Sequence, residues 1–171
     1  GNTALSQFPI DALLEQICSA VRPGQTVLLQ APPGAGKTTR VPLALIGALT
    51  QGQGIFDEHQ KIWMIEPRRL ATKAAAARLA ASLGEDIGAR IGYAVRGEQK
   101  RSNRTQVEVI TDGLFLRRLQ SDPSLDGVGC VIFDEFHERG RDADLSLALL
   151  REARPLLLSL IHISEPTRQP I

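Results

Sequence analysis

The chain has 171 residues and a net charge of +1, with 43% hydrophobic and 23% charged residues. These values are typical of one soluble globular domain, and they exclude a global basic field that would by itself indicate a nucleic-acid partner. The cysteines, Cys18 and Cys130, lie in apolar stretches without metal-ligand spacing, and no stretch is long and apolar enough to span a membrane. We therefore expect buried thiols, a cytoplasmic location and no membrane partner.

In chain order, the first predicted elements are a helix and a short strand. Apolar residues recur at helical spacing from Ile10 to Val21, and Arg22-Pro23-Gly24 ends that helix. The strand Val27 to Gln30 follows and leads into the loop Ala31 to Thr39, with the sequence Ala-Pro-Pro-Gly-Ala-Gly-Lys-Thr-Thr. The next helix starts near Lys37 and contains Pro42, which should shorten or bend it.

The loop has the composition of a phosphate-binding P-loop. Gly34 and Gly36 let the backbone wrap an anion, Lys37 adds a full positive charge, and Thr38 offers a hydroxyl to Mg²⁺. Ala31 stands where the pattern G-x-x-x-x-G-K-[ST] has its first glycine. A flexible turn beside a surface lysine is the alternative, but a strand-like run precedes the loop and a helix-like run follows it. The predicted nucleotide-binding residues are Ala31, Pro32, Pro33, Gly34, Ala35, Gly36, Lys37, Thr38 and Thr39.

The middle of the chain alternates between strands and helices. A polar connection from Gln51 to Gln60 is followed by a strand, Ile62 to Ile65, and an Ala-rich helix, Leu70 to Leu83, that Gly84 closes. The remaining predictions are a strand over Arg90 to Val95, a polar basic loop over Gly97 to Arg104, a strand over Gln106 to Ile110, a helix from Thr111 to Gln120, a strand over Val128 to Phe133 and a last helix from near Asp142. This alternation predicts an α/β fold with a doubly wound parallel sheet and its function at the carboxyl ends of the strands.

A pair of carboxylates, Asp134 and Glu135, follows the most continuous apolar strand. Taken alone, two acids after a strand are a solvated strand end or a helix cap. Beside a P-loop, Asp134 is expected to hold Mg²⁺ together with Thr38, and Glu135 to contact the metal site while it orients and deprotonates the attacking water. His137 is predicted to couple the phosphate site to the rest of the machinery, although as an isolated residue it would be a surface charge.

Four motifs together resemble motifs I, Ia, Ib and II of the DEAH-box RNA helicases. They are Ala31 to Thr39, Glu66-Pro-Arg-Arg-Leu-Ala, Thr111-Asp-Gly and Asp134-Glu-Phe-His-Glu-Arg, and Phe136 resembles the bacterial HrpB-type subgroup. The resemblance runs from about Ile10 to Arg154. It implies a RecA-like P-loop NTPase domain, with a mostly parallel sheet, helices on both faces and truncation at its C-terminus. It further implies the first motor domain of a helicase that uses ATP and Mg²⁺ to unwind RNA.

The resemblance also implies which residues contact ligands. RNA contacts are expected near Arg68, Arg69, Thr111, Asp112 and Gly113, and an adenine contact is expected from Arg78 by its spacing after motif Ia. Two arginines at a helix start oppose the favourable direction of the helix dipole, which indicates that they meet an anion, with solvated arginines as the alternative. Tyr93 and Arg96 match a Gly-Tyr-x-x-Arg stretch of the family whose role does not follow from the residues.

The end of the chain departs from the family pattern. Leu158 to Arg168 resembles an in-frame translation of a transposon sequencing adapter, with a divergent native tail as the alternative. We therefore predict a helicase domain over residues 1–157 and a non-native, disordered or loosely packed tail over residues 158–171. The family's Ser-Ala-Thr motif and second RecA-like domain have no counterpart here, so the fragment should be nearly inactive by itself.

Two alternative functions remain open. A nucleotide-binding P-loop module without turnover would keep the loop but lose Glu135, which is present. A DNA translocase ATPase would share every motif, because no residue can be assigned to the 2′-hydroxyl of RNA.

Overall fold

A computed structural model describes residues 10–21, 25–31, 35–48, 54–57, 59–134 and 159–162. The helices in these residues are α1 (Ile10–Ala20), α2 (Ala35–Leu45), α3 (Arg69–Leu83) and α4 (Asp112–Ser121). The strands are β1 (Val27–Ala31), β2 (Lys61–Glu66), β3 (Ile91–Val95), β4 (Glu98–Lys100), β5 (Val107–Thr111), β6 (Val128–Asp134) and β7 (Ser159–His162). The predicted elements within this part of the chain are confirmed to within about two residues. The helix predicted from Asp142 lies outside the described residues.

The described strands form one sheet in the order β4-β3-β5-β2-β6-β1-β7. All neighbouring strands run parallel, except that β4 is antiparallel to β3. Strand β6 lies between β1 and β2, and Cys130, Val131 and Ile132 are almost completely buried in it. A parallel strand covered on both faces must be apolar along its whole length, which explains the uninterrupted apolar run of the sequence.

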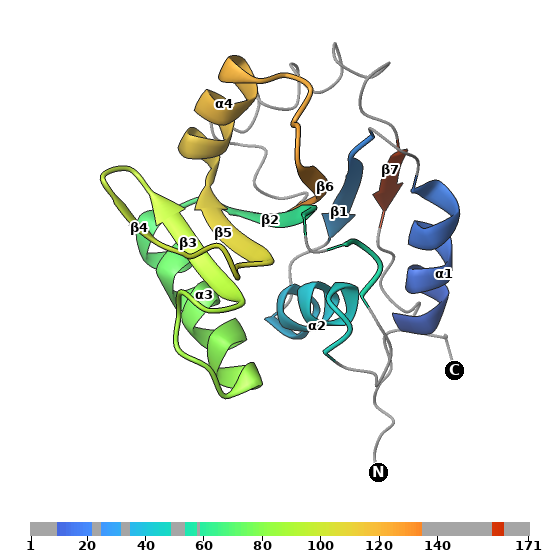
Figure 1. Cartoon of the computed structure of the whole chain (residues 1–171), viewed down its shortest axis with the longest axis horizontal. Coiled ribbons are helices and arrows are strands. Elements are labelled where there is room, and N and C mark those ends of the chain that lie inside the picture. Colours follow the sequence, from blue (N-terminus) through green and yellow to red (C-terminus); the bar gives the residue numbers. More distant parts are fainter. Residues whose placement is uncertain are drawn as a thin grey trace, which may run out of the picture.

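Helices cover both faces of the sheet (Figure 1). On one face, α1, α2 and α3 pack over alternate strand residues such as Val27 and Leu29, and on the other face α4 packs over residues such as Leu28. Alternation of side chains along a strand supplies both surfaces. This arrangement confirms the predicted RecA-like fold.

Helix α3 lies close to the sheet because its inner face is made of small residues. Ala75, Ala76 and Ala80 are buried together with Leu79. Gly84 ends the helix in a left-handed conformation, with φ of 66°, and its N–H bonds back to the carbonyls of the last turn. Only glycine adopts this conformation without a steric penalty, so the predicted helix end is confirmed.

The two outermost strands of the sheet, β4 and β7, differ from the predictions. The segment Gly97 to Arg104 is not wholly a loop, because Glu98 to Lys100 form β4, which pairs with β3 across a turn where Gly97 has φ of 80°. An edge strand needs no apolar residues. Because the side chains of β4 are polar or charged, the hydrophobic pattern of the sequence did not predict a strand there. The tail over residues 158–171 is predicted to be disordered or loosely packed, but residues 159–162 form β7, which pairs in parallel with β1. A segment of native or non-native origin can pair through its backbone with an open strand edge, so the predicted non-native origin stays a prediction.

The two cysteines differ. Cys130 is buried as predicted, and burial raises the pKa of its thiol. Cys18 is exposed, contrary to the prediction, because it follows the buried Ile17 by one position and so lies on the outer face of α1. Among the described helices, none is long and apolar enough to cross a membrane.

Candidate functional site

The carboxyl ends of β1 and β6 lie side by side. Ala31, the last residue of β1, is in register with Asp134, the last residue of β6, and α2 begins at Ala35. The predicted P-loop therefore starts beside the predicted metal-binding acid. The side chains of Ala31, Asp134 and residues 35–39 are not described, and Pro32, Pro33, Gly34, Glu135 and His137 lie outside the described residues altogether.

This backbone arrangement fits a nucleotide and a divalent cation. The N-terminus of α2, with Lys37 and Thr38 in its first turn, follows the strand after only a short connection. Free backbone N–H groups and the helix dipole favour a phosphate at this position. The predicted ligands, the Asp134 carboxylate and the Thr38 hydroxyl, are oxygen donors of the kind that Mg²⁺ prefers. Within the described residues, no separate group of three or more His, Cys, Asp or Glu could hold a metal ion.

The carboxyl ends of β2, β5 and β3 continue the row formed by the carboxyl ends of β1 and β6. Glu66 at the end of β2 is in register with Thr111 at the end of β5, and Ala94 of β3 is in register with Ile110 of β5. The segments that follow these strands therefore meet at one edge. They carry the predicted RNA-binding residues, Arg68, Arg69, Thr111, Asp112 and Gly113, together with Arg96.

Thr111 also positions the helix that follows it. Its hydroxyl oxygen accepts the N–H of Leu114 at 3.4 Å and so caps the N-terminus of α4. Asp112 lies in the first turn of the helix, where a carboxylate is favoured by the dipole. Capping and the helix dipole thus explain Thr111 and Asp112, and the predicted contact of the motif with RNA stays a prediction.

Arg68 and Arg69, adjacent in the sequence, have different surroundings. The backbone carbonyl of Arg68 accepts the N–H and the hydroxyl of Thr72, while its side chain is exposed and has no hydrogen bond or ion pair within the part of the chain that the structure describes. The guanidinium of Arg69 donates to the carbonyl of Arg96 and to the carboxylate of Glu98, each at 2.7 Å. The anion that Arg69 meets in this structure therefore belongs to the protein.

Glu98 is the centre of a charged cluster, which we call the Glu98 cluster: Arg69, Lys73, Tyr93 and Glu98. The ammonium of Lys73 lies 3.0 Å from the Glu98 carboxylate and 5.7 Å from the centre of the Tyr93 ring, and the Tyr93 hydroxyl donates to Glu98. The hydrogen bonds from Tyr93 and Lys73 lower the pKa of Glu98, and the bond to Glu98 raises the pKa of Tyr93. Glu98 is therefore ionised at neutral pH.

Sequence reasoning singled out Tyr93 but missed Glu98 and Lys73. The reason is that β4 was interpreted as a loop, so nothing placed Glu98 opposite α3. The dipeptide Arg96-Gly97 between two short runs was a usable signal, because a glycine in a two-residue connection is typical of a hairpin.

Arg78, the predicted adenine contact, is exposed on α3, which also packs against α2. Its backbone carbonyl accepts the hydroxyl of Ser82 at 3.0 Å. Exposure leaves its guanidinium available to a ligand, and its role stays a prediction.

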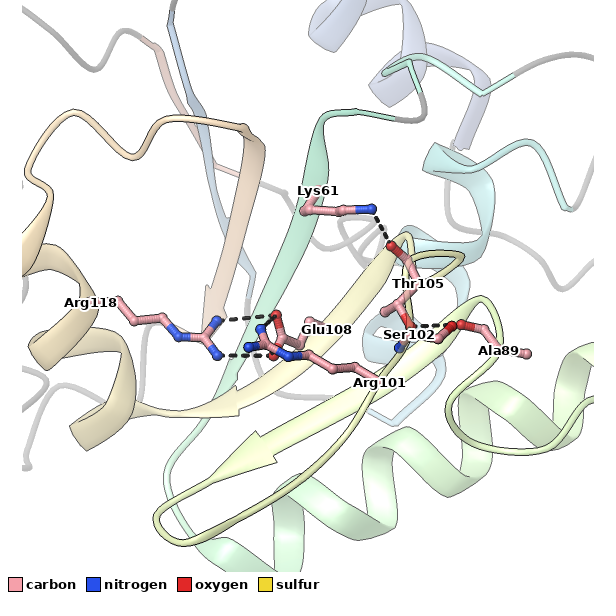
Figure 2. Close-up of polar contacts among 7 residues, drawn as sticks. All are labelled: Lys61, Ala89, Arg101, Ser102, Thr105, Glu108 and Arg118. Atoms are coloured by element: carbon pink, nitrogen blue, oxygen red, sulfur yellow. Dashed lines mark hydrogen bonds and ion pairs between the residues drawn. The ribbon is translucent and has the colours of Figure 1, made fainter.

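A second charged cluster lies at the other end of the strands, near the amino ends of β2 and β5 (Figure 2). Glu108 is only 5% exposed and accepts two hydrogen bonds from Arg118 of α4 and two from Arg101. Arg118 also lies 4.9 Å from the centre of the Trp63 ring. Glu108 thus ties the segment after β4 to α4.

Thr105 completes the attachment of that segment. Its carbonyl accepts the ammonium of Lys61 at 2.6 Å, and its hydroxyl donates to the carbonyl of Ala89 at 2.7 Å and accepts the N–H of Ser102 (Figure 2). The hairpin of β3 and β4 is therefore held at two places, by Glu98 at its turn and by Arg101 and Thr105 behind β4.

Comparison with known proteins gives consistent results. The model of the DEAD/DEAH box helicase family matches residues 12–159. The ATP-dependent RNA helicase HrpB of Escherichia coli (strain K12) is 44% identical over 150 residues, which are 88% of this chain and 18% of that protein. The DExH-box ATP-dependent RNA helicase DExH1 of Arabidopsis thaliana is 34% identical over 149 residues, covering 87% of this chain and 15% of that protein.

A solved structure agrees with the sequence relatives. The crystal structure of E. coli DExH-box NTPase HrpB superposes with a TM-score of 0.71 at 40% identity, covering 98% of this chain and 20% of that one. The chain therefore spans less than a fifth of the length of these two curated relatives.

Proposed function

This chain belongs to the DEAD/DEAH box helicase family, and from that premise we propose that it is the first RecA-like motor domain of an ATP-dependent RNA helicase of the HrpB type. Its chemistry is ATP hydrolysis coupled to the binding and unwinding of RNA. A second RecA-like domain, ATP, Mg²⁺ and single-stranded RNA are the partners that this function requires.

The observation that carries the proposal is the register between Ala31 and Asp134. It brings the start of the P-loop, from one strand, next to the acid of the Asp-Glu pair, from a strand distant in the sequence. A turn with a surface lysine would not need an acidic strand end as its neighbour. A phosphate-binding loop that works with a metal ion does.

The residues that follow β1 and β6 have different proposed roles in ATP hydrolysis. A bound Mg²⁺ would partly neutralise the negative charge of the ATP phosphates. Lys37 would bind phosphate oxygens, and Thr38 and Asp134 would hold the metal ion. Glu135 orients the attacking water and accepts its proton, and His137 links this site to the neighbouring segments. These roles follow from the chemistry of the residue types at the strand ends.

The nucleic acid is proposed to lie along the ends of β2, β5 and β3. Arg68 is an exposed cation at these strand ends, and its side chain has no protein partner in the described part of the chain, so it is available to a phosphate. Phosphate contacts carry affinity rather than sequence preference, which suits a motor that must move along any strand.

The nucleotide site is tested by Lys37→Ala. Loss of a charge-assisted contact of about 1.5–3 kcal/mol should weaken binding of a fluorescent ATP analogue about 10- to 100-fold in the presence of Mg²⁺. Lys100→Ala, which removes an exposed lysine from β4, is the matched control and should bind as the parent does. Equal affinities for Lys37→Ala and the parent would reject the P-loop.

The nucleic-acid site is tested by Arg68→Ala. Removal of one phosphate contact should lower the slope of log K against log salt by about 0.7 for single-stranded RNA. Arg104→Ala, an exposed arginine at the amino edge of the sheet, should leave the slope unchanged. Matched RNA and DNA strands distinguish a helicase that prefers RNA from a DNA translocase, and an unchanged slope in Arg68→Ala would mean that Arg68 is merely solvated.

A further inference from the structure

We propose that Glu98 is a positioning residue of the nucleic-acid site, which holds Arg69 and Lys73 and so limits how many cations of this edge reach the RNA backbone. The inference rests on the proposed function, because it concerns the same binding edge. It adds an anion, built into the β3–β4 hairpin, beside the arginines of the proposed site.

The first support is the charge distribution around the hairpin turn. Arg68 and Arg96 are exposed, and Arg69 and Lys73 pair with the carboxylate of Glu98 at 2.7 and 3.0 Å. Of these four cations, two contact one carboxylate at the end of the sheet where the resemblance places RNA. Glu98 neutralises part of this charge and fixes two of the four side chains.

The second support is accessibility. The side chains of Arg69, Lys73 and Glu98 are 50%, 39% and 35% exposed, so a phosphate can reach both cations from solvent. Exposed ion pairs are individually weak, because water screens them and two long side chains must be ordered. A polyanion can therefore compete with Glu98 for Arg69 and Lys73, but it must displace a carboxylate to do so.

The third support is that Glu98 itself is held in place. The Tyr93 hydroxyl donates to it, and Tyr93 is 5% exposed in the core beneath α3. The hairpin behind it is fixed by Arg101 to Glu108. Glu98 is thus a carboxylate at a defined position, in contrast to a mobile surface acid, and the two cations must come to it.

The test is Glu98→Gln, measured by single-stranded RNA binding over a series of salt concentrations. Release of Arg69 and Lys73 should steepen the slope of log K against log salt by about 0.7 for each new phosphate contact, up to about 1.4, and tighten binding about fivefold at low salt. The matched control is Glu85→Gln, which makes the same charge change in a carboxylate paired with Arg90 after the other end of α3. An equal increase in both variants would mean a general charge effect and would overturn the proposal.

A second variant separates positioning from hairpin stability. Tyr93→Phe removes the hydrogen bond that positions Glu98 but keeps its charge and both cations, so the salt slope should steepen less than in Glu98→Gln. If Tyr93→Phe steepens the slope as much as Glu98→Gln, the effect comes from a loosened hairpin and the proposal is wrong. Thermal unfolding of each variant shows that the binding measurements are made on folded protein.

A labelling experiment gives a readout without RNA. Acetylation of Lys73, followed by mass spectrometry, should be faster in Glu98→Gln than in the parent, whereas acetylation of Lys100 should not change. If the parent binds no RNA, the proposed function fails and this inference fails with it. If the parent binds RNA and responds to Arg68→Ala, but Glu98→Gln changes neither slope nor labelling, only the inference about Glu98 is rejected.

Discussion

Replacement of Glu108 by glutamine should destabilise the domain far more than replacement of its exposed partner, Arg101, by alanine. The side chain of Glu108 is 6% exposed, and those of Arg118 and Arg101 are 19% and 41% exposed. Glu108→Gln leaves the mostly buried guanidinium of Arg118 without a counter-charge. An uncompensated buried charge costs about 3–5 kcal/mol.

The expected magnitude lies near the lower end of that range, at about 3 kcal/mol, because Arg118 keeps some contact with water and lies over the Trp63 ring. The exposed pair with Arg101 contributes about 0.5 kcal/mol, as surface pairs do. For a chain of this length, about 3 kcal/mol corresponds to a fall in Tm of about 6–12 °C.

The assay is thermal and urea unfolding followed by circular dichroism. Glu108→Leu combined with Arg118→Met is the companion variant, because it removes both charges and should cost much less than the two single changes added together. This account of the cluster would be refuted by a Glu108→Gln protein whose stability lies within about 0.5 kcal/mol of the parent. It would also be refuted if Arg101→Ala were less stable than Glu108→Gln.

The hairpin and the catalytic residues give the remaining predictions. Gly92→Ala should lower the free energy of unfolding by about 1–3 kcal/mol, because a Cβ there would lie 2.7 Å from the carbonyl oxygen of Lys100 and 2.9 Å from the Cβ of Arg101. An unchanged Tm would contradict the close packing of β3 against β4. Tested by itself, the chain should hydrolyse ATP only at a trace rate, because arginine fingers worth about 10³–10⁵ in rate are expected from a second domain. Glu135→Gln should therefore change this rate little, and strong RNA-stimulated phosphate release by the parent chain would contradict the two-domain account.

The sequence by itself determined the elements whose residues act locally. The apolar run over Val128 to Phe133, bounded by turn signals, predicted a central parallel strand, and Gly84 after an Ala-rich stretch marked a helix end. The P-loop and the Asp-Glu pair were likewise predicted, because each is a short pattern with its own physical reason. The family followed from the order of these patterns, and the match over residues 12–159 confirms it.

Only the tertiary structure decided which distant residues meet. The polar edge strand β4 carries no pattern of burial, so it did not appear in the sequence, and Glu98 could not be assigned to Arg69 before β4 was placed beside β3. Strand β7 was missed for another reason, because the tail was interpreted as non-native. Arg68 and Arg69 were indistinguishable as adjacent cations, yet only one of them has a carboxylate partner in the described structure. A backbone pattern depends on neighbours a few residues away, whereas the partner of a charged side chain depends on strands that pair across the whole fold.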